Sequence, residues 1–371
     1  MSVKGSMHYR DTGVLDNTEL GLRALLAWVN RTGEFRGPGQ PGRKAVEVGF
    51  FASVVDIGHG LGLALCTDGV GTKVLVAQML ERYDTIGIDC VAMNVNDAIC
   101  VGAEPVSFLD YIAIEAATPA VLEAIGKGLH EGARRANVSI VGGEISQIAE
   151  IIKGERPGRG LDLVGMCAGL VRLDRVILGR EVKPGDAVIG FASSGIHSNG
   201  FTLARRALFQ AGGLTSTSRV AELGGTVGDE LLTPTHIYVA PIMDLLRRGA
   251  PLRALAHITS DGFLNLTRID AAVGFRLDRL PKPPPIFDLI QRSGDIAIAE
   301  MYRVFNMGIG FCVIVPPDQS AIADVEGTAR VHGFAAQVIG EVIEDPDRRV
   351  FLPEHGLVGQ GDQFTVSTRR A

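Results

Sequence analysis

The stretch Cys66-Thr67-Asp68-Gly69-Val70-Gly71-Thr72-Lys73 is the most informative part of the sequence. The apolar run at 61–66 predicts a buried strand that ends in this glycine turn. Glycines let the backbone approach a ligand closely and present N–H groups to anions. Lys73 can neutralise phosphate oxygens, and Asp68 can hold a divalent cation. These residues indicate a nucleotide site with magnesium, although a plain glycine turn explains so short a motif equally well.

The composition is that of a globular protein with two domains of ordinary size. Of its 371 residues 46% are hydrophobic and 21% are charged, which suffices for a substantial core. The net charge of -6 lacks the basic excess of nucleic-acid-binding proteins, so we expect no nucleic-acid partner. The sequence also lacks a membrane-length apolar run and a signal peptide. We therefore expect a cytoplasmic protein with no membrane partner.

The cysteines indicate a reducing compartment. They have no C-x-x-C spacing and lie in apolar surroundings, which predicts buried free thiols and argues against a zinc site. The five positions are Cys66, Cys90, Cys100, Cys167 and Cys312.

Strand and helix patterns interleave in both halves of the chain, which predicts an α+β protein with each sheet covered by helices. The polar stretch 172–180 marks a domain boundary near residue 174. We therefore expect an N-terminal domain over 1–174, a C-terminal domain over 175–345 and an appended tail over 346–371. The Gly- and Pro-rich segment 31–44 is either a linker or a lid over a phosphate.

Several polar residues interrupt apolar patterns in the first half. Asn96 and Asp97 end an apolar-patterned helix over 87–100 and offer oxygen ligands suited to magnesium, unless they form a solvated helix face. Asp110 lies inside an apolar strand, where a carboxylate is costly unless it is paired or binds something. Glu144 follows two glycines at a strand end, which is typical of a ligand-facing acid or of an ordinary turn.

A second dense cluster, Ser193-Ser194-Gly195-Ile196-His197-Ser198-Asn199-Gly200, follows a strand and precedes a helix. Its amides and hydroxyls can cradle a phosphate at the helix N-terminus, and His197 is the best candidate for proton transfer. The plainer alternative is a helix cap, which Asn199 satisfies. The stretch His257-Ile258-Thr259-Ser260-Asp261-Gly262 repeats the order of strand, polar turn and helix.

Taken in order, these clusters resemble the phosphoribosylformylglycinamidine cyclo-ligases, the aminoimidazole ribonucleotide synthetases of purine synthesis. The likeness covers about residues 9–343 and begins with Tyr9-Arg-Asp-Thr-Gly-Val14. The other matching pieces are Thr67-Asp-Gly-Val-Gly-Thr-Lys73, Gly87-Ile-Asp89, Val95-Asn-Asp97, Gly102-Ala-Glu-Pro105, Phe108-Leu-Asp-Tyr-Ile112, Gly142-Gly-Glu144, Val182-Lys-Pro-Gly-Asp186, the cluster at 192–200, His257-Ile-Thr259 and Phe305-Asn-Met-Gly-Ile-Gly310.

The resemblance implies two α/β-sandwich-like domains. It implies that the N-terminal domains bind ATP and dimerise, contributing strands to a shared barrel, while helices cover the C-terminal sheet. The implied cofactors are ATP and Mg2+, and the implied partners are a small-molecule nucleotide substrate and a second copy in a homodimer. In the implied reaction, ATP phosphorylates the formyl amide oxygen of formylglycinamidine ribonucleotide. The amidine nitrogen then closes the imidazole ring, and ADP and phosphate are released.

The resemblance also assigns roles to individual positions. It implies catalytic roles for His197, Asp97 and Lys73. It implies nucleotide contacts for Asp68, Gly69, Val70, Gly71, Thr72, Lys73, Asn96, Asp97 and Glu144, of which Asp68, Asp97 and Glu144 hold the metal. It implies substrate contacts for Asp110, Ser194, Gly195, His197, Ser198, Asn199, His257 and Thr259.

Three departures from the family pattern bear on the substrate. Ser260-Asp261-Gly262 stands where the family usually has three glycines, Ile145-Ser-Gln-Ile-Ala149 replaces a Thr-Ala-Glu-Met-Pro-like run, and Val48-Gly-Phe-Phe51 replaces Gly-Gly-Phe-Gly. We expect Asp261 to point away from the site, as an acid favoured at a helix start. The alternatives are a relative with a shifted substrate, such as a thiamine phosphate kinase-like enzyme, and a non-catalytic nucleotide-binding regulator. A selenophosphate synthetase-like enzyme lacks support because the glycine loop carries no reactive cysteine.

Overall fold

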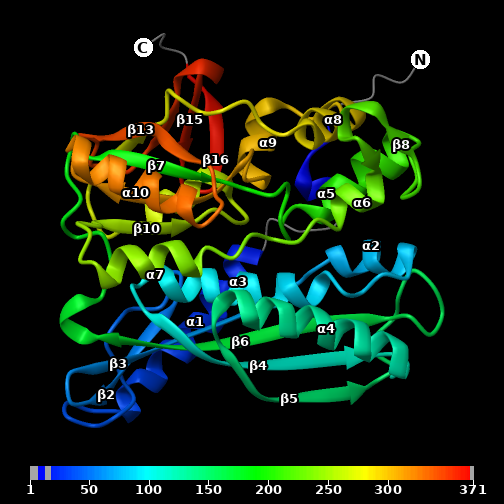
Figure 1. The fold of residues 1–371 in the computed structure, drawn as a ribbon, viewed down its shortest axis with the longest axis horizontal. Coiled ribbons are helices and arrows are strands. Elements are labelled where there is room, and N and C mark those ends of the chain that lie inside the picture. The colour runs from blue at the N-terminus through cyan, green and yellow to red at the C-terminus, as the bar shows by residue number, and fades with distance from the viewer. Residues whose placement is uncertain (1–6, 13–17, 368–371) are drawn as a thin grey trace.

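The structure is a computed structural model that describes residues 7–12 and 18–367. Its first half is a sheet with the strand order β1-β2-β3-β6-β4-β5 (Figure 1). The strands are β1 (Arg43–Lys44), β2 (Ser53–Gly58), β3 (Leu61–Gly69), β4 (Glu104–Ile114), β5 (Ser139–Gln147) and β6 (Leu161–Arg172). The helices of this half are α1 (Thr18–Val29), α2 (Lys73–Leu80), α3 (Ile86–Cys100) and α4 (Pro119–Ala136).

The second half is a larger sheet with the order β10-β12-β7-β13-β11-β14-β15-β16. Its strands are β7 (Ala187–Ala192), β10 (Ala254–His257), β11 (Gly274–Arg276), β12 (Ile309–Val315), β13 (Ala336–Ile343), β14 (Val350–Leu352), β15 (Leu357–Gln360) and β16 (Gln363–Val366). The helices here are α5 (Phe201–Arg205), α6 (Val227–Leu231), α7 (Val239–Arg247), α8 (Pro285–Gly294), α9 (Ile298–Val304) and α10 (Gln319–Val331). The pair β8 (Arg219–Val220) and β9 (Gly225–Thr226) forms a separate ribbon.

The last strands differ from the expected appended tail over 346–371. β14 pairs in parallel with β11, with Phe275 opposite Val350, and β15 and β16 continue the same sheet as a hairpin. Val350, Leu352 and Leu357 are buried. These apolar side chains pack against the domain, so the segment up to Val366 is an integral edge of the second sheet.

Helix α3 lies at the centre of the molecule, between the two sheets (Figure 1). Apart from Asp97 all of its residues are buried, and it packs against α4, β3 and β6 on one side and β10 on the other. Close packing with α4 needs glycine, because a Cβ at Gly87 would lie 2.3 Å from the backbone nitrogen of Leu129. An apolar pattern around the whole helix is typical of such a central position.

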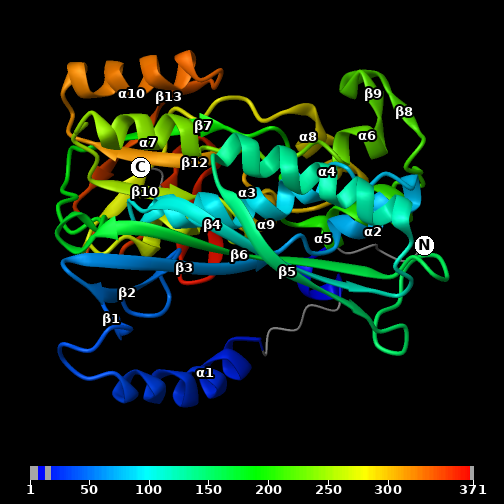
Figure 2. The same cartoon turned by 60° about the horizontal axis from the view of Figure 1, so that its bottom comes forward.

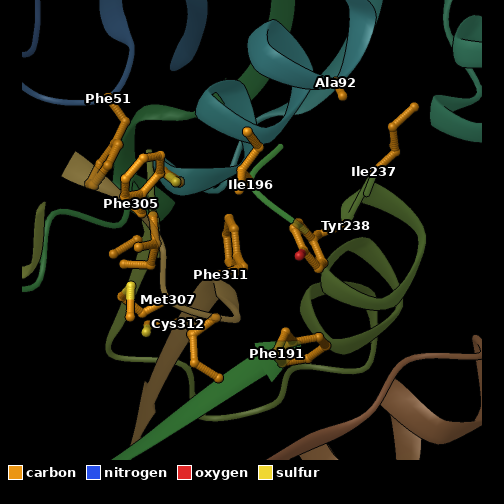
Figure 3. Close-up of a cluster of buried hydrophobic side chains, with 14 of the residues drawn as sticks. Phe51, Ala92, Phe191, Ile196, Ile237, Tyr238, Phe305, Met307, Phe311 and Cys312 are labelled. Atoms are coloured by element: carbon orange, nitrogen blue, oxygen red, sulfur yellow. The ribbon is translucent and has the colours of Figure 1, made fainter. Parts of the chain in front are cut away.

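A single hydrophobic core joins the two halves. It includes Ala92 of α3 and Phe311 of β12, and Figure 3 shows these residues around Ile196 and Tyr238. The Tyr238 and Phe311 rings are 5.4 Å apart. Because this core is apolar, fully buried and built from both halves, it fixes the loops that lie between them.

The other face of the first sheet carries exposed apolar side chains. Helices α3 and α4 cover one face, whereas α1 lies on the opposite side (Figure 2). On the open face Tyr111 of β4 is 40% exposed, Met166 of β6 37% and Leu170 of β6 40%.

Among the described residues, no helix is long and apolar enough to span a membrane.

Candidate active site

Lys73, at the start of α2, is fully buried at the boundary between the two halves. Its Nζ atom lies 2.9 Å and 2.8 Å from the two carboxylate oxygens of Asp89 on α3. It also donates hydrogen bonds to the carbonyl oxygens of His197, at 3.1 Å, and Thr233, at 2.7 Å. Asp89 Oδ1 in turn accepts from the backbone N–H and the hydroxyl of Thr235, at 2.8 Å and 2.6 Å. One buried ion pair therefore joins two helices of the first half to two loops of the second half.

This environment differs from the expected contact of Lys73 with phosphate. The Lys73 side chain has no exposed surface, and its hydrogen bonds are all internal. Burial lowers the pKa of the ammonium, and the charge of Asp89 opposes that shift. The first turn of α2 directs Lys73 toward α3, where it pairs with the carboxylate of Asp89. Lys73 therefore holds the His197 loop through its hydrogen bond to the His197 carbonyl oxygen, and its expected catalytic role stays a prediction.

Asn96 was expected among the nucleotide ligands, but its amide is also used inside the protein. Its Oδ1 accepts from the N–H of Tyr238 at 2.9 Å, and its Nδ2 donates to the carbonyl oxygen of His236 at 2.8 Å. The side chain is fully buried. Asn96 therefore fixes the chain at residues 236–238, and the partly exposed carboxylate of Asp97 lies beside it at this end of α3.

Asp97, His257 and Asp68 form a charged cluster between the halves. The Nδ1 of His257 donates to Asp97 Oδ1 at 2.8 Å, and the Asp97 side chain is 19% exposed. Asp68 lies near the end of β3, where burial and then the negative charge of Asp97 raise its pKa to about 6. The N–H of Gly69, which donates to Asp68 Oδ1 at 2.7 Å, and the charge of His257 offset part of this shift. Two carboxylates that repel each other in a half-buried site are typical of a place for a cation.

Glu144, the third expected metal ligand, does not join this cluster within one chain. It is exposed on β5, at the edge of the sheet, and pairs with Tyr111. Since strand side chains alternate between faces, Glu144 shares the open face with Tyr111, whereas its neighbour Gly143 faces Asp110. The described part of the chain contains no group of three His, Cys, Asp or Glu residues arranged for a metal. A site that includes Glu144 therefore needs another chain or a rearrangement.

Asp110 lies on the helix-covered face of β4. The register places Gly165 of β6 between Asp110 and Asp68. Gly143 leaves room for the carboxylate, since a Cβ there would lie 2.6 Å from Asp110 Oδ1. Burial raises the pKa of Asp110. Its expected contact with the substrate stays a prediction.

The glycine loop contacts the second half directly. Ser198 Oγ donates to the carbonyl oxygen of Val70 at 3.1 Å, and the hydroxyls of Thr72 and Thr202 are 3.0 Å apart. Gly71 has a φ of +67°, and the space beside its Cα is open. The N–H groups of Val74 and Leu75 in the first turn of α2 donate to the carbonyl oxygens of Gly71 and Thr72, both at 3.2 Å. The turn therefore places the amides of Gly71 and Thr72 at the helix N-terminus, where an anionic phosphate can bind.

His197 is held in a left-handed conformation, with a φ of +59°, and is 2% exposed. Its Nε2 accepts from the N–H of Ser194 at 3.2 Å, which assigns the ring proton to Nδ1. Nδ1 is buried without a partner in the described structure. Burial lowers the pKa of His197 well below its usual value, with smaller contributions from His236, His257 and Lys73, so the ring is neutral at physiological pH. The ring can therefore donate a hydrogen bond from Nδ1 to a bound group.

The loop after β10 lies next to the 193–200 cluster. Ser260 Oγ donates to Asn199 Oδ1 at 3.0 Å, and the N–H of Gly262 donates to the carbonyl oxygen of Thr259 at 3.1 Å. Asp261 has a φ of +70°, which explains why glycine is usual in the family at this position. Burial raises the pKa of Asp261, while the charges of Arg268 and Arg303 oppose that shift. The carboxylate thus has positive neighbours, although it makes no cap hydrogen bond to the helix that follows.

Two site neighbours were missed from the sequence. His236 has its ring 6.2 Å from that of His197. Burial, followed by the charge of Arg135, lowers the pKa of His236 to about 4. Glu230 lies beside Gly195, where an added Cβ would be 3.5 Å from its Oε1. Neither residue follows a strand in a polar turn, so the pattern that revealed the other clusters gave no signal.

Comparisons with known proteins identify both halves of the chain. The N-terminal domain of AIR synthase related proteins matches residues 51–171, and their C-terminal domain matches residues 183–353. The phosphoribosylformylglycinamidine cyclo-ligase of Methanothermobacter thermautotrophicus is 50% identical over 80% of this chain and 84% of its own. That of Methanocaldococcus jannaschii is 43% identical over 91% of this chain and 92% of its own.

A solved HypE–HypF complex contains a similar fold, with a TM-score of 0.59 and 21% identity over 85% of this chain and 93% of that one. The two-domain α+β architecture expected from the sequence is therefore confirmed. Together the two domain models cover most of the chain, and the cyclo-ligases match at high identity across both halves. The chain belongs to the phosphoribosylformylglycinamidine cyclo-ligase family of AIR synthase related proteins.

Proposed function

We propose that the chain closes the imidazole ring of formylglycinamidine ribonucleotide at the expense of ATP, in de novo purine biosynthesis. The products are aminoimidazole ribonucleotide, ADP and phosphate. The observation that carries the proposal is the convergence of the glycine loop, the Asp68–Asp97–His257 cluster and the 193–200 loop on one interdomain boundary. The same clusters are shared with relatives named for this reaction.

The proposed reaction has two steps, phosphoryl transfer and ring closure. The γ-phosphoryl group passes from ATP to the formyl amide oxygen, and ADP leaves. The amidine nitrogen then attacks the activated carbon, the C–O bond breaks and phosphate leaves with that oxygen. Such steps need mainly positioning and neutralisation of charge. The amides at Gly71 and Thr72 would bind a phosphate, and the neutral His197 ring would donate from Nδ1 to an oxygen of the substrate.

The carboxylates of Asp68 and Asp97 fit a magnesium ion. Their mutual repulsion contributes to the raised pKa of Asp68, and a divalent cation would relieve it. Asn94 lies next to them, since its Nδ2 donates to the carbonyl oxygen of Asp68 at 3.1 Å while its Oδ1 is buried without a partner. We infer that Asp68 and Asp97 would hold the ion, which would neutralise charge on the phosphates. His257 would fix the orientation of the Asp97 carboxylate.

A second copy of the chain is the proposed partner of the open face of the first sheet. Tyr111, Met166 and Leu170 expose apolar surface on this face, and exposed apolar patches of this kind mark interaction sites. Helix α1 adds exposed apolar residues, with Leu25 60% and Trp28 71% exposed. In such a homodimer Glu144 would face the partner.

The buried free thiols support a cytoplasmic location, which we also propose.

Removing the Asp97 carboxylate tests the reaction. We expect Asp97→Asn to lower kcat/KM for formylglycinamidine ribonucleotide by about 10²–10³-fold, because a charge-stabilising group is lost. The matched control Asp84→Asn changes an exposed acid of the same half and should leave turnover unchanged. The measurement is release of ADP with and without the ribonucleotide. If the wild-type rate of ADP release is unchanged by the ribonucleotide but increases with thiamine phosphate, the shifted-substrate alternative is favoured.

The raised pKa of Asp68 makes a prediction about stability. Between about pH 4 and pH 6 the native state holds a proton that the unfolded state has lost, so the free energy of unfolding falls as pH rises through this window. Asp68→Asn should therefore increase the free energy of unfolding by about 1–2 kcal/mol at pH 7.5 without magnesium, and by much less at pH 4.5. Urea unfolding at both pH values measures this. Destabilisation by Asp68→Asn at pH 7.5 would contradict the assignment.

The open face makes a prediction about assembly. Met166→Lys should convert a dimer into monomers, because it places a charge in an apolar interface. The control Val331→Lys alters a residue that is 82% exposed on α10 in the second half, and should leave the dimer intact. Sedimentation velocity gives both masses. A monomeric wild-type chain, or a Met166→Lys variant that remains dimeric, would rule out this face as the interface.

A further inference from the structure

The hairpin β15–β16 lies beyond the residues that the family's domain models match. The C-terminal model ends at residue 353, whereas the described chain continues through the 3-10 helix Pro353–His355 and the two strands to residue 367. Phe364 of β16 is 6% exposed, so the hairpin is packed onto the second half rather than loosely attached. Helix α9 is its main partner outside the sheet.

Helix α9 supports the loop that follows His257. Gly262 lies directly on its C-terminal end, since a Cβ there would be 2.1 Å from the carbonyl oxygen of Tyr302 and 2.9 Å from that of Phe305. The next residue, Phe263, stacks on the Tyr302 ring with centroids 6.2 Å apart. The position of the loop therefore depends directly on where Tyr302 lies.

The hairpin holds Tyr302 from the other side. The Tyr302 hydroxyl and Nε2 of His355 are 2.6 Å apart in a hydrogen bond, and their rings are 4.8 Å apart. The ring of Phe364 lies 6.4 Å from that of Tyr302. Tyr302 is fully buried, whereas His355 is partly exposed.

A second contact links the hairpin to the same loop. A Cβ at Gly359 of β15 would lie 2.7 Å from a methyl carbon of Leu264 and 2.6 Å from the ring of Phe364. Leu264 belongs to the 3-10 helix Gly262–Arg268, whose first turn follows the loop. The hairpin therefore touches both the helix that supports the loop and the chain that leaves it.

We propose that the segment 354–366, which comprises the hairpin β15–β16 and the end of the 3-10 helix before it, positions the substrate loop 259–262, with Tyr302, His355 and Phe364 as positioning residues. Through the hydrogen bond from Ser260 to Asn199, the same support extends to the 193–200 cluster. The hydrogen bond and ring contacts of Tyr302, His355 and Phe364 do not reach Asp68 or Asp97. The hairpin thus acts on the substrate side of the site and leaves the nucleotide side unchanged. The kinetic part of this inference rests on the proposed function.

The test compares three variants. Tyr302→Phe removes only the hydroxyl and keeps the packing, whereas Phe364→Ala removes a buried ring. Val366→Ala is the control, because this residue of the same hairpin is 72% exposed. Hydrogen exchange of residues 257–266 and the separate KM values for formylglycinamidine ribonucleotide and ATP are measured. Tyr302→Phe remains informative even where Phe364→Ala fails to fold.

We expect Tyr302→Phe to speed amide exchange in residues 259–264 by about tenfold, since local opening becomes easier. The KM for the ribonucleotide should rise by roughly five- to tenfold, while the KM for ATP stays within about twofold, because only the substrate loop is misplaced. The control should match the wild type in all three values. A purely structural hairpin would lower the melting temperature without this split.

Two results would overturn the inference: unchanged exchange over 259–264 in folded Tyr302→Phe, or equal increases in both KM values. The exchange result does not depend on any substrate. A wild-type chain without cyclo-ligase activity would therefore refute the proposed function, while exchange over the loop would still decide whether the hairpin positions it.

Discussion

The buried ion pair between Lys73 and Asp89 is the interaction on which the rest of the structure depends. Removing two charges from water is costly, and only a close, fully hydrogen-bonded pair offsets that cost. Here the partners include the carbonyl oxygens of His197 and Thr233 and both donors of Thr235. The glycine loop that precedes Lys73 and the loop that carries His197 are consequently held in one register.

Around this pair, several groups are kept in unfavourable states. His197 and Asp261 adopt left-handed backbone conformations, Asp68 faces a second carboxylate, and the Nδ1 donor of His197 has no partner. Each costs free energy that the surrounding core must supply. Such costs are concentrated where a protein binds something that relieves them. The charges of Asp68 and Asp97 and the unpaired donor together describe a site complementary to a cation and a phosphate-bearing ligand.

The sequence predicted much of the fold, because apolar periodicity reports burial directly. The helix expected over 87–100 is α3, and the strand expected over 61–66 lies in β3. The tail was misjudged because the short strands β14–β16 carry too few apolar residues to reveal which sheet they join. Of the site, the clusters at 66–73, 193–200 and 257–262 were each singled out from the sequence, and hydrogen bonds join them in the structure.

The roles that depend on a bound ligand stay predictions. The side chains of Lys73 and Asn96 are of types that suit phosphate and magnesium. In the structure, however, Lys73 is hydrogen-bonded to Asp89 and Asn96 to the backbone N–H of Tyr238. Glu144 was expected to face a ligand because it follows two glycines at a predicted strand end, yet its side chain lies on the open face of the sheet. Residue type indicates what a side chain can bind, whereas only the packing of the two halves decides which partner it meets.

The most direct test of this account is a double-mutant cycle on the ion pair, measured as the free energy of unfolding in urea. Lys73→Met and Asp89→Asn should each cost about 3–5 kcal/mol, because each leaves a buried charge unpaired. The double variant should cost much less than their sum. Lys127→Met is the control, since that lysine is 69% exposed in an ion pair with Glu123 on α4, and it should change stability by less than about 1 kcal/mol. Additive costs, or single costs as small as the control, would contradict the claim that this pair holds the site together.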